Sequence, residues 1–133
     1  MISFYNKDDI CEIINHIKIY SHDFSGKTVL LSGRGGFIGR YLVEIFRRLN
    51  AGILNKPVHL IILDNLNADK TSFAKQSKDK NTKFITHNTI KAFQYNGKLD
   101  FIIHSAGIAS PNTITGYFLW KNYTFRSLAR EKC

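Results

Sequence analysis

The sequence predicts an α/β fold in which a parallel sheet is flanked by helices. Short apolar runs at 29–31, 58–63 and 101–104 have the length and composition of strands that are covered on both faces. Between the first two runs, apolar residues recur at helical spacing from Phe37 to Leu49. Strand, helix and strand in this order are typical of parallel sheets, which bind ligands at the carboxyl ends of their strands.

Residues 1–26 precede the first strand, and we expect them to form a helical extension packed on the domain. Asn6 can cap a helix here, and Asp8 and Asp9 fall in its first turn, where negative charge is favourable. A helix that binds a partner is the alternative. Apolar residues at helical spacing mark the expected buried face, namely Ile10, Ile13, Ile14 and Ile17.

A glycine pattern follows the first strand directly and predicts a turn that leads into the next helix. Gly33, Gly36 and Gly39 have the spacing G-x-x-G-x-x-G. In nucleotide-binding turns of this kind, one glycine permits the tight turn, one lets the backbone approach the phosphates, and one lets helix and strand pack closely. The free amides at the start of the helix would then face a bound pyrophosphate.

The strand at 58–63 runs into Asp64, whose carboxylate can accept hydrogen bonds from both ribose hydroxyls of an adenosine. A polar insert at 50–57 accounts for the long interval between the glycines and this aspartate. The glycine pattern alone is weak evidence for dinucleotide binding, and the aspartate after the next strand strengthens it. An ordinary strand-end turn over Asp-Asn-Leu-Asn is the alternative for Asp64.

Further strands are predicted at 84–86 and 101–105, and the second ends in the small residues Ala106 and Gly107. The other segments are expected to be a loop with a short helix at 65–83, a helical segment at 90–95 and a last amphipathic helix at 117–128. No fifth or sixth strand is predicted. The sheet is therefore expected to be truncated after its fourth strand, with an exposed edge that favours self-association.

Composition narrows the class of protein. With 133 residues the chain can bury one sizeable core, so we expect one domain. No apolar run approaches the roughly 20 residues needed to cross a bilayer, and the first residues do not read as a signal peptide, so a cytoplasmic protein is expected. Cys11 and Cys133 have no motif spacing, which favours reduced thiols over a disulfide or a metal site.

The formal net charge of +9 raises the question of nucleic-acid binding. Lysines between residues 70 and 83 are spread over a polar stretch without regular aromatic interleaving and without a nucleic-acid motif. They indicate a solvated surface, and a basic nucleic-acid binder is kept as an alternative function. A positive field would also favour anionic cofactors and sugar nucleotides.

Three segments together resemble the extended short-chain dehydrogenase/reductases, in particular the NAD-dependent epimerase/dehydratase family of nucleotide-sugar enzymes. They are Val29–Gly39, Leu63–Leu66 and Asp100–Pro111, and the third is most similar to UDP-glucuronate decarboxylases and sugar-nucleotide 4,6-dehydratases. Ser32 stands where the family usually has threonine. The resemblance implies that residues 27–133 form part of an NAD-binding Rossmann domain, in a protein of nucleotide-sugar metabolism and polysaccharide biosynthesis.

The resemblance also implies which residues contact NAD. The pyrophosphate would be lined by Gly33, Gly36, Phe37, Ile38 and Gly39. The adenosine ribose would be held by Asp64 and Asn65, and the Asp64 carboxylate would favour NAD over NADP. The nicotinamide-side ribose would be bordered by Ser105, Ala106 and Gly107. Asn88 takes the place of the family's aspartate beside adenine, where an amide can still form a hydrogen bond.

The resemblance assigns no catalytic residue to this chain. These enzymes use a tyrosine and a lysine at Y-x-x-x-K spacing with an upstream serine or threonine, and the lysine lowers the tyrosine pKa. Tyr117 and Lys121 have this spacing, but they follow Pro111 almost directly, whereas the family's pair comes after a further strand. We therefore expect surface or packing positions there, and we expect no metal site.

The function expected from these observations is the NAD-binding N-terminal part of a nucleotide-sugar epimerase, dehydratase or decarboxylase. Members of the family are much longer, so we expect a fragment that is inactive alone. It would take a nucleotide sugar only when the second half is supplied. A non-catalytic NAD-binding or partner-binding regulatory module is the alternative.

Overall fold

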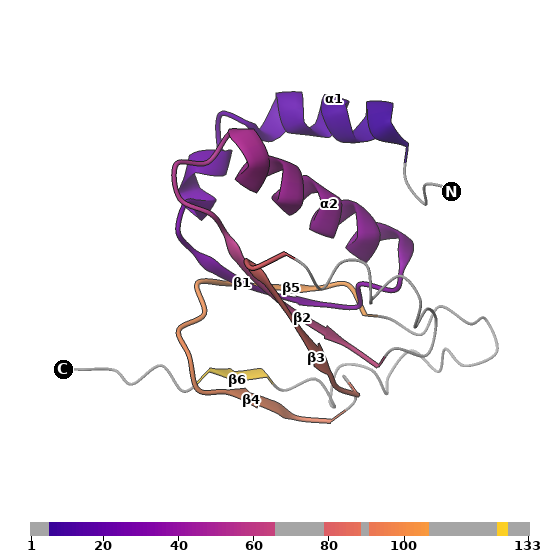
Figure 1. Cartoon of the computed structure of the whole chain (residues 1–133). Helices are drawn as coiled ribbons and strands as arrows, with labels where there is room; N and C mark the ends of the chain where they lie inside the picture. The colour runs from indigo at the N-terminus through magenta and orange to yellow at the C-terminus, as the bar shows by residue number, and fades with distance from the viewer. Residues whose placement is uncertain (1–5, 66–78, 89–90, 107–124, 128–133) are drawn as a thin grey trace.

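The computed structural model describes residues 6–65, 79–88, 91–106 and 125–127. Figure 1 shows two helices above a sheet and a short pair of strands beneath it. No helix within these ranges is long and apolar enough to cross a membrane. The elements are α1 (Lys7–Ile17), the short 3-10 helix η1 (Ser21–Phe24), β1 (Thr28–Ser32), α2 (Phe37–Gly52), β2 (His59–Asp64), β3 (Thr82–Thr86), β4 (Phe93–Tyr95), β5 (Phe101–His104) and β6 (Phe125–Ser127).

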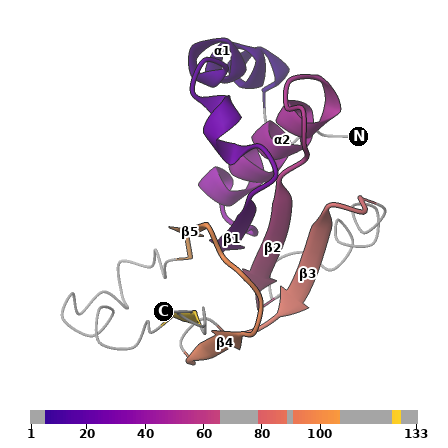
Figure 2. The ribbon, with the colours of Figure 1, turned by 90° about the vertical axis from the view of Figure 1, so that its left-hand side faces the viewer.

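The central sheet has four parallel strands in the order β3-β2-β1-β5. β1 lies in the middle, where Leu30 is paired with Ile61 on one side and with Ile102 on the other. β3 continues the sheet beyond β2, as Figure 2 shows from the side. The predicted α/β class is confirmed, and this strand order is the one found in the first half of a Rossmann-type sheet.

α2 covers one face of the sheet. Side chains alternate between the two faces along a strand, so every second residue of β1 and β2 points toward this helix. Its apolar side, at helical spacing, packs against them. The buried residues of this layer include Val29, Leu31, Val43, Phe46, Leu49, Leu60 and Ile62.

α1 lies on the outer side of α2 and contributes Ile10 and Ile14 to the same core (Figure 1). The Asn6 side chain caps α1 by accepting a hydrogen bond from the Asp8 amide at 3.0 Å, as predicted. The Tyr41 hydroxyl of α2 accepts from the Asn6 amide at 3.2 Å and donates to the Asp9 carboxylate at 3.0 Å. Apolar packing and this polar bridge together attach the N-terminal helix to the sheet domain.

Truncation of Ile10 tests the attachment of α1. Ile10 is fully buried, so Ile10→Ala is expected to lower the free energy of unfolding by about 2 to 5 kcal/mol in urea denaturation. Ile19→Ala is the matched control, because this side chain is 67% exposed and its loss should change stability by less than about 0.5 kcal/mol. Equal effects of the two substitutions would contradict the packing of α1 on α2.

The opposite face of the sheet is covered by an extended segment. Leu30, Ile61 and Leu63 form the buried layer there, and β4 packs against it with Phe93 and Tyr95. The expected helix at 90–95 is therefore wrong for the residues of β4. Phe93 and Tyr95 alternate with the exposed Gln94, and this two-residue period is that of a strand.

A second expectation fails at the far end of the chain. A helix was expected over 117–128, yet residues 125–127 form β6, which runs parallel to β4 with Phe93 paired to Phe125. Pairing with a strand distant in sequence overrides the local helical periodicity. The remainder of the expected helix lies outside the described residues.

Candidate functional site

The turn after β1 is held between the ends of its two neighbouring strands. Gly33 has a positive φ of 84°, a conformation that side-chain-bearing residues rarely adopt. Its amide donates to the Leu63 carbonyl of β2 at 3.0 Å. A Cβ at this position would lie 2.5 Å from the Ala106 Cα just after β5, so the close approach of the two backbones also requires glycine.

Gly36 and Gly39 have opposite surroundings. A Cβ on Gly39 would lie 2.7 Å from the Arg34 Cα, because the first turn of α2 packs directly against the glycine loop. Gly36 is the N-cap of α2, and the nearest atom to a Cβ there would be the Gly33 carbonyl oxygen at 3.6 Å. A side-chain atom therefore fits at Gly36 among the described residues, whereas the other two glycines are packed.

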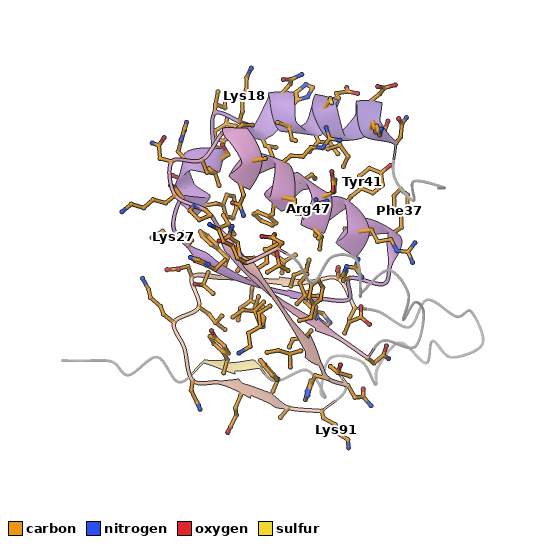
Figure 3. All side chains as sticks on the ribbon, in the orientation of Figure 1. Lys18, Lys27, Phe37, Tyr41, Arg47 and Lys91 are labelled. Atoms are coloured by element: carbon orange, nitrogen blue, oxygen red, sulfur yellow. The ribbon has the colours of Figure 1, made fainter. Side chains whose placement is uncertain are left out.

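The first turn of α2 presents amides without a partner in the helix itself, as every helix N-terminus does. The first turn contains no acidic residue, so its partial positive charge is not offset by a neighbouring side chain on the helix. Phe37 and Ile38 were expected to line the pyrophosphate. These residues are 72% and 63% exposed, and Figure 3 shows Phe37 at the start of α2. The groups suited to phosphate there are backbone amides.

Asp64 ends β2 beside the same loop. Asp64 is 8% exposed, and its carboxylate accepts a hydrogen bond from the Gly35 amide at 2.7 Å. This bond ties the glycine loop to the position where the adenosine ribose was expected. Asn65 follows as an exposed residue at the end of the strand.

Asn88 lies just beyond β3, the strand next to β2. The His87 amide donates to the Asp64 carbonyl at 3.0 Å, which places the residues after β3 beside the end of β2. Asn88 is exposed, and its backbone carbonyl accepts from the Lys91 amide at 2.9 Å. The structure thus gathers Asn88 with the glycine loop and Asp64 at one edge of the sheet.

The end of β5 closes the other side of the loop. Ser105 donates from its amide to the Ser32 carbonyl at 2.9 Å and from its hydroxyl to the same oxygen at 2.7 Å. Its hydroxyl proton is therefore used to hold the turn, although Ser105 was expected at the nicotinamide-side ribose. Ala106 packs against Gly33, and Gly107 lies outside the described residues.

No protein-family model and no curated protein matches this chain. Within the described ranges no group of three or more His, Cys, Asp or Glu side chains could hold a metal ion, and Tyr117 and Lys121 lie outside those ranges.

Sequence reasoning missed two polar residues that meet beneath the loop. The Ser32 hydroxyl is hydrogen-bonded to Nδ1 of His104 at 2.5 Å, and the two residues are direct partners in the register of β1 and β5. Ser32 is 1% exposed. The available signal was a single polar residue at the carboxyl end of each of two apolar strands, which parallel pairing brings together.

Protonation of His104 makes the stability of the contact between β1 and β5 depend on pH. Partial desolvation of the ring lowers the pKa of His104 below its usual value, although the residue is exposed, so the folded state favours the neutral imidazole. Its contribution to stability is present above the unfolded-state pKa of about 6.5 and is lost as the pH falls below that value. Urea denaturation should show lower stability at pH 5 than at pH 7.5, with a smaller difference in His104→Asn. His22→Asn changes an exposed histidine outside the sheet and is the control; an equal loss of pH dependence there would contradict the assignment.

Proposed function

We propose that this chain binds NAD at the carboxyl edge of its sheet, as the N-terminal part of a nucleotide-sugar epimerase, dehydratase or decarboxylase. The observation that carries the proposal is the exposed, side-chain-free Gly36 at the start of α2, next to a loop amide bonded to Asp64. These features lie together where Rossmann-type sheets bind dinucleotides.

Backbone amides would bind the pyrophosphate of the dinucleotide. A pyrophosphate beside Gly36 would meet the free amides and the positive end of the dipole of α2, a helix of 16 residues. The lack of a side chain on Gly36 lets the phosphates approach these amides closely. The positive formal charge of the chain, +9, favours an anionic ligand over the surface as a whole.

The two ends of the dinucleotide would lie on opposite sides of the loop. On the β2 side, the adenosine ribose would lie beside Asp64, whose carboxylate also accepts from the Gly35 amide. On the β5 side, Ala106 leaves room for the nicotinamide ribose to pass close to the backbone. Reaction with a sugar nucleotide would require groups that the described residues do not supply.

Calorimetric titration of the folded chain with NAD tests this function. Saturable binding of NAD, tighter than binding of adenosine monophosphate alone, is the expected result, because the pyrophosphate and second ribose add contacts. The same titration with a short DNA duplex at two salt concentrations tests the nucleic-acid alternative, which predicts strongly salt-dependent binding. Binding of DNA without binding of NAD would contradict the proposal.

Self-association is the partner interaction that the structure favours. β5 is paired with β1 along one edge, and within the described ranges no strand pairs with its other edge. Phe101 and Ile102 on this strand are 38% and 44% exposed. Sedimentation velocity should therefore show concentration-dependent association, which Ile102→Lys reduces and Ile19→Lys does not. A monomer at all concentrations would contradict this expectation.

A further inference from the structure

We propose that the amino edge of the central sheet binds a single-stranded nucleic acid. This edge consists of the residues that directly precede β3, β2, β1 and β5, and it lies opposite the carboxyl edge where NAD is proposed to bind. Parallel strands all begin at the same edge, so residues far apart in the sequence meet there. The proposal goes beyond the proposed function and depends on none of its residues.

A lysine precedes every strand of this sheet. In the order β3-β2-β1-β5 these residues are Lys80, Lys56, Lys27 and Lys98. Neighbouring strands lie about 4.8 Å apart, so the four lysines form a row about 14 Å long. The residues are scattered in the sequence, where the stretch that contains Lys80 was expected to be a solvated surface. Only the order of the strands aligns them.

Hydrogen bonds and packing fix the backbone of this row. The Lys27 carbonyl accepts from the first amide of β2 at 2.9 Å, and the Asn81 carbonyl, directly after Lys80, accepts from the second at 2.8 Å. The stem of Lys56 lies over Gly26, since a Cβ on this glycine would be 3.4 Å from Lys56 Cδ. Lys27 and Lys56 are therefore neighbours in space.

The carboxylates that accompany these lysines have partners of their own. Asp79 accepts two hydrogen bonds at the start of β3, at 2.9 and 2.8 Å. Asp100 accepts from the first amide of β1 at 2.9 Å and from the Lys98 ammonium at 3.1 Å. Lys56 and Lys80 are exposed, and among the described residues neither has a carboxylate within 4.0 Å. Their charges are therefore available to an anionic partner.

An aromatic ring stands at the β5 end of the row. Phe101 is the first residue of β5, three positions after Lys98, and it is 38% exposed. The centre of its ring lies 4.9 Å from that of Phe24, which supports it from one side. Surfaces that bind single strands combine cations along the phosphates with aromatic rings on which bases stack. This combination favours a single strand over an acidic polypeptide, which has the charge but no bases.

The experiment is a fluorescence-anisotropy titration of a labelled oligothymidine of about 12 nucleotides with the full chain. Saturable binding is expected. Four phosphate contacts, one for each lysine, predict about a 50-fold loss of affinity between about 50 and about 200 mM salt. Lys56→Gln combined with Lys80→Gln should weaken binding at low salt at least about tenfold and reduce the salt slope by about 1.4. Both side chains are exposed, so the thermal midpoint should not change.

Lys7→Gln combined with Lys91→Gln is the matched control for the loss of two positive charges. Both residues are exposed, and Figure 3 shows Lys91 far from Lys27. This variant should change the affinity by less than about threefold, because salt screens charges that are remote from the bound strand. Phe101→Leu tests stacking, since it keeps an apolar side chain at this position and removes the ring. It should weaken binding at least about fivefold.

The outcomes separate this proposal from the proposed function. Equal weakening by the two lysine pairs would overturn the amino edge as the site, because the attraction would then reflect overall charge. Displacement of the oligothymidine by saturating NAD would also overturn it, since Figure 3 shows Lys27 and Phe37 on opposite sides of the molecule. Polyglutamate binding as tight as that of the oligothymidine, with no effect of Phe101→Leu, would overturn the assignment to nucleic acid. Oligothymidine binding that depends on Lys56 and Lys80 in a chain that does not bind NAD would overturn the proposed function alone.

Discussion

Gly36→Asp is expected to abolish NAD binding while leaving the fold intact. The substituted carboxylate would stand where the pyrophosphate must approach, and like charges about 4 Å apart repel by about 4 kcal/mol at an effective dielectric constant of 20. A loss of affinity of at least about a hundredfold follows. Calorimetry measures this loss directly.

The fold should tolerate this substitution for two reasons. Gly36 has a φ of −76°, which any residue adopts, and among the described residues a Cβ there would have no neighbour closer than 3.6 Å. Aspartate is also a better N-cap than glycine by a few tenths of a kcal/mol, so the thermal midpoint should be unchanged or slightly raised. Gly36→Asn has the same shape without the charge and should retain more affinity. NAD binding by Gly36→Asp at wild-type strength would place the phosphates elsewhere.

Gly33→Ala is expected to have the largest effect on folding. A left-handed conformation costs a side-chain-bearing residue about 1 to 2 kcal/mol. The added methyl group would also lie 2.5 Å from the Ala106 Cα, and the strands on either side of the turn leave little freedom to move away. We expect a total loss of about 3 to 5 kcal/mol in urea denaturation, a large share of the stability of an ordinary domain.

Gly52→Ala is the matched control for this prediction. It places the same methyl group at the last residue of α2, where no atom of the part of the chain that the structure describes lies within 4 Å of the new Cβ. Alanine is the better helix former, so this substitution should raise stability by up to about 1 kcal/mol. Similar stability of the two variants would show that the turn after β1 is not packed as described.

Elements with strong local signals were predictable from the sequence. α1 was marked by its cap and the spacing of its isoleucines, and α2 by the glycines before it and the apolar stripe along it. β1 and β2 were marked by apolar runs of strand length. In each case the local preference and the burial in the final fold agree, so a short window of sequence contains the information.

Elements formed by distant pairing were not predictable in the same way. β4 and β6 are three residues each and pair with one another across the chain, and their sequences favoured helix when read locally. The site residues divide in the same way, into those with a local sequence signal and those brought together by distant pairing. The glycine loop and Asp64 were identified from spacing, whereas the bond between Ser32 and His104 joins residues 72 positions apart. Only the parallel register of β1 and β5 brings them together.

Backbone amide chemical shifts during an NAD titration test the central claim most directly. The account predicts that the largest shifts occur in residues 33–39, with smaller ones at Asp64, Asn65 and Ala106, and that the exposed face of α1 is unaffected. Saturation of these shifts at one common dissociation constant would place the dinucleotide at the glycine loop. Saturable shifts confined to other surfaces, with residues 33–39 unchanged, would contradict it.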